Sequence, residues 1–115
     1  MFKVQRTGSK MFVTGDYKFC TDIARQATQQ DKLVYILFEE RDGKWYKCGI
    51  IGGKYEAFRL ANGYEIKKKD GKRWLYLSSV YLGVKNWVTD YLYSKKYKTF
   101  KAAEGIIEEL MKGEK

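Results

Sequence analysis

The sequence predicts a single α+β domain, in which a strongly twisted antiparallel sheet is accompanied by one helix near each end of the chain. Three observations lead to this fold class. Turn dipeptides recur at near-regular intervals, apolar and polar residues alternate between them, and two segments show the apolar spacing of amphipathic helices. A length of 115 residues suits one modest hydrophobic core, so residues 1–115 are treated as one domain.

The middle of the chain, residues 33–79, is predicted to be a five-stranded meander. Two-residue hairpin turns need positive φ, which Asn, Asp and Gly adopt most readily. Four suitable dipeptides follow one another at intervals of 10, 10 and 8 residues: Asp42-Gly43, Gly52-Gly53, Asn62-Gly63 and Asp70-Gly71. Each interval leaves about six to eight residues for a strand, which is a common strand length.

The N-terminal segment is expected to form a hairpin followed by a helix. Apolar and polar side chains alternate over residues 1–6, and a second short strand is expected over residues 11–14 after the turn at Thr7-Gly8-Ser9. Asp16 suits the N-cap of a helix over residues 17–30, in which apolar side chains recur every three or four residues.

The C-terminal part is predicted to contain one more strand and one helix. Residues 87–93 have strand-like composition, although a helix would also gather their apolar side chains on one side, and both alternatives are open. Thr99 can cap a helix over residues 100–112, which has a clean apolar stripe and which Gly113 should end.

Strand alternation assigns every meander residue to one of two sheet faces. One face is almost entirely apolar and is expected to be the core side, covered by one or both helices: Leu33, Tyr35, Leu37, Cys48, Ile50, Tyr55, Ala57, Ile66, Leu75 and Leu77. A one-residue bulge within the meander would exchange the faces beyond it.

The opposite face combines aromatic rings with lysines. Turn-based register makes four of its side chains cross-strand neighbours: Lys47, Phe58, Lys67 and Trp74. Single-stranded nucleic acid is bound by such surfaces, because bases stack on the rings while ammonium groups follow the phosphates. Glu56 and Glu65 share this face and are expected to be ion-paired.

The same pattern allows a structural interpretation. A second helix packed over this face, near the apolar side chains of residues 34–38, would make Trp45, Phe58 and Trp74 ordinary core residues. Lysine–aromatic pairs also occur on solvated sheets that bind nothing.

A basic hairpin tip extends the candidate site. Three lysines precede the turn at Asp70-Gly71 and Lys72 follows it, so this tip could contact phosphates or could keep an edge hairpin from pairing with other chains. The candidate nucleic-acid-binding residues are Trp45, Lys47, Phe58, Lys67, Lys68, Lys69, Lys72, Trp74 and Tyr76.

Composition favours a polyanionic partner and disfavours catalysis. The chain has 23 Lys and Arg against 14 Asp and Glu, a net charge of +9, of which residues 62–98 hold +6. It contains no His and two Cys, so His-based catalysis is excluded and no zinc site can be completed. We therefore expect no enzyme activity, no cofactor and no metal.

The expected function is that of a small, basic, non-catalytic nucleic-acid-binding protein, with single-stranded nucleic acid favoured. The alternative is a small modulator or inhibitor, encoded by a phage or mobile element, that binds a host protein through a surface rich in Tyr and Trp. No apolar run reaches the length of a membrane helix and the N-terminus lacks the apolar core of a signal peptide, so we expect no membrane partner and a cytoplasmic location.

Overall fold

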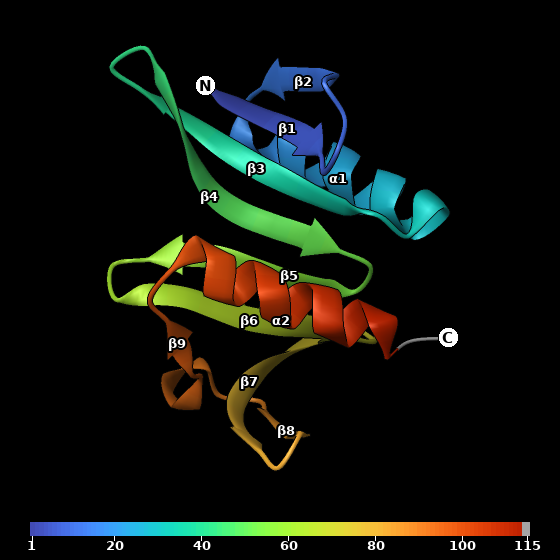
Figure 1. Ribbon diagram of the computed structural model, residues 1–115, viewed down its shortest axis with the longest axis vertical. Coiled ribbons are helices and arrows are strands. Elements are labelled where there is room, and N and C mark those ends of the chain that lie inside the picture. The colour runs from blue at the N-terminus through green and yellow to red at the C-terminus, as the bar shows by residue number, and fades with distance from the viewer. Residues whose placement is uncertain (114–115) are drawn as a thin grey trace.

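The computed structural model describes residues 1–113 and confirms the predicted α+β fold class (Figure 1). Its strands are β1 (Phe2–Arg6), β2 (Phe12–Gly15), β3 (Val34–Arg41), β4 (Lys44–Gly52), β5 (Tyr55–Leu60), β6 (Gly63–Asp70), β7 (Arg73–Tyr81), β8 (Val84–Val88) and β9 (Lys96–Tyr97). Its helices are α1 (Tyr17–Asp31), the 3-10 helix η1 (Tyr91–Tyr93) and α2 (Phe100–Lys112). Among these described residues, no helix is long and apolar enough to cross a membrane.

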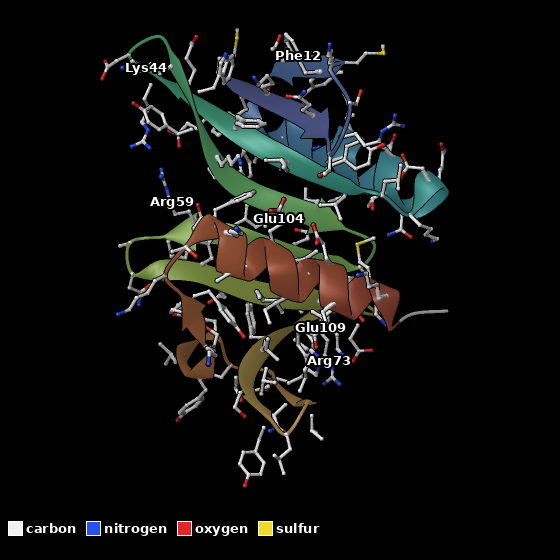
Figure 2. All side chains as sticks on the ribbon, in the orientation of Figure 1. Phe12, Lys44, Arg59, Arg73, Glu104 and Glu109 are labelled. Atoms are coloured by element: carbon white, nitrogen blue, oxygen red, sulfur yellow. The ribbon has the colours of Figure 1, made fainter. Side chains whose placement is uncertain are left out.

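The strands form one open antiparallel sheet in the order β2-β1-β3-β4-β5-β6-β7-β8. The meander of β3 to β7 is therefore confirmed, and β8 extends it. The short strand β9 pairs with β6 at Tyr64 and Glu65, where β7 no longer pairs with β6. Figure 2 labels Phe12 on the edge strand β2 and Arg73 at the start of β7, in distant parts of this sheet.

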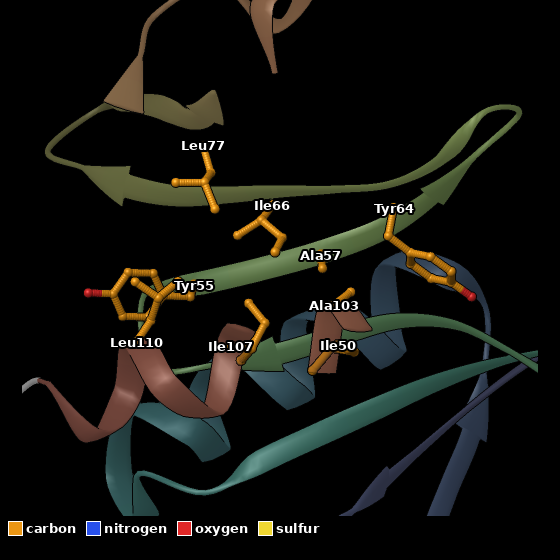
Figure 3. Packing of buried hydrophobic residues seen from close by; sticks show 9 residues of the cluster. All are labelled: Ile50, Tyr55, Ala57, Tyr64, Ile66, Leu77, Ala103, Ile107 and Leu110. Atoms are coloured by element: carbon orange, nitrogen blue, oxygen red, sulfur yellow. The ribbon is translucent and has the colours of Figure 1, made fainter. Parts of the chain in front are cut away.

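The two helices lie on opposite faces of the sheet, with α2 in front and α1 behind in Figure 1. Consecutive residues of β4 show the division: Ile50 belongs to the core under α2, and Ile51 belongs to the core under α1. The α2 core is centred on Ile66, Leu77 and Ile107, which are fully buried (Figure 3). Hydrophobic burial against both faces stabilises the sheet.

Both helices begin where the sequence predicts. The Asp16 side chain accepts a hydrogen bond from the Phe19 backbone N–H at 2.7 Å, and the Thr99 hydroxyl accepts one from the Ala102 N–H at 3.1 Å. Each cap satisfies a backbone donor that the helix itself leaves unpaired.

Three of the four meander turns are centred one residue away from the dipeptide predicted to form them. Asp42-Gly43 does occupy the centre of its turn, with φ values of 53° and 76°. The other turns centre on residues 53–54, 61–62 and 71–72. Gly52 lies instead within β4, where a Cβ atom would approach the Met111 sulfur of α2 to 2.5 Å, so this glycine serves close packing and not the turn.

A β-bulge at Cys48 corrects the predicted faces. Leu37 pairs with Gly49 and Phe38 pairs with Lys47, so Cys48 has no partner on β3. The extra residue turns the β3 side chains over relative to β5–β7. Tyr35 and Leu37 consequently pack under α1, on the face opposite Ile50, although the sequence pattern predicted that all three share one face.

The predicted strand over residues 87–93 is wrong in its bounds. Strand β8 ends at Val88, and the Asp90 side chain caps η1 by accepting from the Leu92 N–H at 2.9 Å. The turn that starts β8 is Leu82-Gly83, since Tyr81 pairs with Val84. Leucine is not a typical turn residue, so turn chemistry did not indicate this hairpin.

Leu82 holds an unfavourable backbone conformation, and its replacement should stabilise the protein. Its φ is 50°, and its side chain is 86% exposed. Asparagine tolerates positive φ better than leucine, so Leu82→Asn should raise the free energy of unfolding by about 1 kcal/mol. Denaturant unfolding would measure this. Val84→Asn is the control, and equal stabilisation by both variants would refute the backbone explanation.

The two thiols are free, and the fold should depend on neither disulfide nor metal. Unfolding midpoints measured with and without reductant and chelator should coincide. Burial raises the pKa of the Cys48 thiol to about 11, so little reactive thiolate exists at neutral pH. Modification by a thiol reagent should be slow at pH 7 and accelerate about tenfold per pH unit. Rapid modification at pH 7 would contradict this burial.

Candidate nucleic-acid interface

Helix α1 contacts mainly β1 to β4, so most of the face that β5, β6 and β7 present on the side of α1 lies beyond this helix. Phe58 of β5 is the exception, because it packs against the core under α1. Five of the predicted site residues lie on this half-face: Phe58, Lys67, Lys69, Trp74 and Tyr76. We call this set the Trp74 surface. It forms because side chains at alternating positions of three neighbouring strands point the same way.

Lys67 lies between two rings of the Trp74 surface. Its Nζ atom is 4.3 Å from the Trp74 ring centroid and 5.5 Å from that of Phe58. The Nζ atom of Lys69 lies 4.9 Å from the Trp74 ring. These are cation–π distances, so two ammonium groups rest on one partly buried indole.

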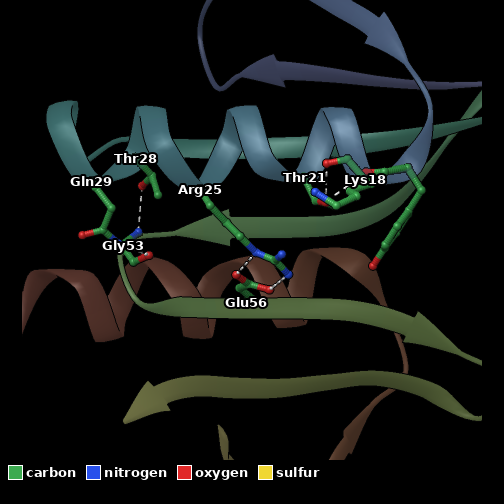
Figure 4. A network of polar contacts seen from close by, with 8 residues as sticks. Lys18, Thr21, Arg25, Thr28, Gln29, Gly53 and Glu56 are labelled. Atoms are coloured by element: carbon green, nitrogen blue, oxygen red, sulfur yellow. Dashed lines mark hydrogen bonds and ion pairs between the residues drawn. The ribbon is translucent and has the colours of Figure 1, made fainter. Parts of the chain in front are cut away.

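A cavity of about 440 Å³ opens beside Trp74 and Lys69, and its other side is formed by α1. Arg25 of α1 reaches across it to the buried carboxylate of Glu56 on β5 (Figure 4). The two side chains form a bidentate pair, with N–O distances of 2.8 and 2.9 Å. This pair fixes the distance between α1 and the floor of the surface.

The segment after β8 closes the other side of the Trp74 surface. The ring of Tyr91 in η1 lies 6.4 Å from the ring of Tyr76, edge to face. Next to it, the Ser94 hydroxyl donates to Glu65 at 2.8 Å and the Lys96 ammonium lies 3.3 Å from the same carboxylate. Glu56 and Glu65 are thus both ion-paired, as the sequence predicted.

The electrostatics of this surface favour an anionic ligand. Arg25 and Lys96 neutralise the carboxylates of Glu56 and Glu65, while Lys67 and Lys69 make no ion pair within residues 1–113. Desolvation by burial lowers the pKa of Lys67, because the buried ammonium has lost part of its hydration. A phosphate oxygen next to this ammonium would replace the lost solvation.

The structure does not bring all the predicted site residues together. Trp45 and Lys47 lie on the α2 side of the sheet, because the Cys48 bulge separates their face from that of Phe58. Lys68 is also on the α2 side, 4.4 Å from the Trp87 ring. Lys72 lies in the β6–β7 turn and is exposed.

The predicted cross-strand neighbours are wrong as well. Phe58 pairs with Gly49 and Glu65, and Lys67 pairs with Glu56 and Tyr76. Lys67 meets Phe58 and Trp74 diagonally instead. The opposing Gly49 makes room for this arrangement, because a Cβ atom there would lie 2.7 Å from the Phe58 ring.

Sequence reasoning missed the residues that flank the surface. Arg25 and Tyr17 of α1 and Tyr91 of η1 come from segments remote from the meander, and only tertiary packing brings them to it. Comparison with protein-family models, curated proteins and solved structures found no match. No group of three potential metal ligands occurs within residues 1–113.

Proposed function

We propose that this protein binds single-stranded nucleic acid on the Trp74 surface, without catalysis. The observation that carries the proposal is the contact of Lys67 and Lys69 with one partly buried indole at 4.3 and 4.9 Å. A single strand offers bases and phosphates in alternation, and this surface offers rings and ammonium groups in alternation.

Binding would proceed by exchange of contacts. A base stacks on Trp74 and displaces an ammonium group from the ring, and that ammonium group moves to a neighbouring phosphate. The cavity between α1 and Trp74 provides room for a nucleotide beside the ring. A single strand fits this proposal better than a duplex, because the bases of a duplex are stacked on one another and are not available to the indole.

Titration of a labelled oligonucleotide of about 15 nucleotides tests the proposal, with anisotropy as the readout and salt varied from about 50 to 200 mM. We expect a strong salt dependence and weaker binding of the matching duplex. Absence of binding at low salt, or equal affinity for both nucleic acids, would refute the proposal.

Two adjacent lysines provide a matched comparison for the same assay. Lys69→Gln should weaken binding of all sequences alike and reduce the slope of log affinity against log salt by about 0.7, one phosphate contact. Lys68→Gln removes the same charge from the opposite face and should leave the slope unchanged. Equal effects of the two changes would assign the attraction to overall charge and not to the Trp74 surface.

A second candidate function, binding of a protein partner, is favoured by the β7–β8 hairpin. Its apex exposes Leu82 in an unfavourable conformation, next to Tyr81, which is 71% exposed, and Val84, which is 62% exposed. Exposed apolar residues kept at a conformational cost are typical of interaction sites. The oligonucleotide titration separates the two candidates, because a protein-binding module has no affinity for the probe.

A further inference from the structure

The residues that the bulge removes from the Trp74 surface form a second cluster on the opposite face. The Lys3 Nζ atom lies 5.0, 4.6 and 4.9 Å from the ring centroids of Phe12, Phe38 and Trp45. Four strands, β1 to β4, contribute one residue each, and these four residues are called the Lys3 cluster. Lys47 adjoins it, since Lys47 pairs with Phe38 and places its Nζ atom 4.8 Å from the Phe100 ring.

Most of this second cluster lies on strands that α2 does not pack on. The contacts of α2 are with β4, β5, β6 and β9, and the cluster extends towards the β2 edge of the sheet. A cavity of about 230 Å³ lies beside it, lined among others by Gln5, Phe38 and Lys47. The Lys3 cluster thus combines the same features as the Trp74 surface: aromatic rings, ammonium groups and an adjoining cavity.

Charge indicates the kind of ligand. Lys3 and Lys47 make no ion pair within the described residues, so their charge is uncompensated there. Glu40 lies opposite Trp45 and weakens the positive potential at one end of the cluster only. An anionic strand with stacking bases complements this surface, whereas an apolar partner would leave both ammonium groups without counterions.

We infer that the Lys3 cluster is a second binding surface for single-stranded nucleic acid, so that one protein molecule joins two strands. The inference rests on the proposed function of the Trp74 surface. The two surfaces lie on opposite faces of the sheet and towards opposite edges, so a short strand bound at one leaves the other accessible.

The mass of the complex tests this stoichiometry. Oligonucleotides of about eight nucleotides are short enough to occupy one surface each, and native mass spectrometry counts strands per chain. We expect two strands on one parent chain. Mixed donor- and acceptor-labelled strands should also show energy transfer that depends on the protein.

Variants on each face identify the surfaces. Trp45→Ala combined with Lys47→Gln should leave one strand bound and abolish energy transfer, and Trp74→Ala combined with Lys69→Gln should do the same from the other side. If the double variant at Trp45 and Lys47 impairs folding, Lys47→Gln alone replaces it in the test. Glu40→Gln should strengthen the binding of the strand at the Lys3 cluster.

The outcomes separate the two proposals. One strand per parent chain, with binding unaffected by the changes at Trp45 and Lys47, would overturn the second surface and leave the first intact. Two strands per chain with no loss in the Trp45 variant would overturn it as well. No strand on the parent chain would refute the proposed function and the inference together.

Discussion

Trp74→Ala should weaken the binding of single-stranded oligonucleotides about 5- to 150-fold, which corresponds to about 1–3 kcal/mol for one lost stacking contact. The ring carries two ammonium groups at 4.3 and 4.9 Å, so its removal also releases Lys67 and Lys69 from their fixed positions. The measurement is an anisotropy titration at constant salt. Because most of the phosphate contacts remain, the salt slope should change little.

The stability of the same variant decides whether Trp74 belongs to a binding surface or to a core. A surface indole held by cation–π contacts should cost about 1 kcal/mol of unfolding free energy when it is removed, whereas a core tryptophan would cost about 3–5 kcal/mol. Trp87→Ala is the matched comparison, since Trp87 packs against the α2 core and should show the larger loss. If Trp74→Ala were as destabilising as Trp87→Ala, the Trp74 surface would be a core and the binding proposal would fail.

Arg25→Ala should destabilise the fold by about 3 kcal/mol, because it leaves the Glu56 carboxylate buried without a partner. The Glu56 side chain is 4% exposed, and Arg25 supplies both of its strong hydrogen bonds. The melting temperature should fall by about 10–20 °C, measured by circular dichroism. Because Arg25 itself is 40% exposed, the expected loss of stability lies at the lower end of the range for breaking a buried ion pair.

Two controls identify the cause of that loss. Gln26→Ala changes the exposed neighbour of Arg25 on α1 and should have little effect. Replacing both partners, with Arg25→Met and Glu56→Leu, should recover most of the stability because no buried charge remains. If the double replacement were as destabilising as Arg25→Ala, lost packing and not the unpaired charge would be the cause.

The elements of this fold could be predicted wherever local chemistry decides the backbone. Asp16 and Thr99 mark helix starts because their oxygens accept from the backbone donor three residues later, whatever the rest of the chain does. Strand alternation likewise placed Phe58, Lys67, Lys69, Trp74 and Tyr76 on one face. Misplacing a turn by one residue left this grouping unchanged. Such an error shifts the pairing of the two strands by two residues, so every side chain keeps its face of the sheet.

The composition of the binding surface could not be predicted in full, because it depends on contacts between distant segments. Gly52 and Gly63 resemble turn residues in the sequence, yet Met111 of α2 and the Tyr97 carbonyl approach the positions where their Cβ atoms would lie. The Arg25–Glu56 pair joins residues 31 positions apart and requires α1 to be docked.

The amino-acid pattern by itself determined the number and order of the meander strands, both helices and the abundance of lysine and aromatic side chains. Tertiary structure decided on which side of the sheet those side chains lie. A single unpaired residue, Cys48, turns Trp45 and Lys47 to the α2 side while Phe58 and Trp74 stay on the α1 side. The physical reason is that a strand bulge depends on how β3 and β4 pair around two packed helices, and no short-range sequence signal encodes that pairing.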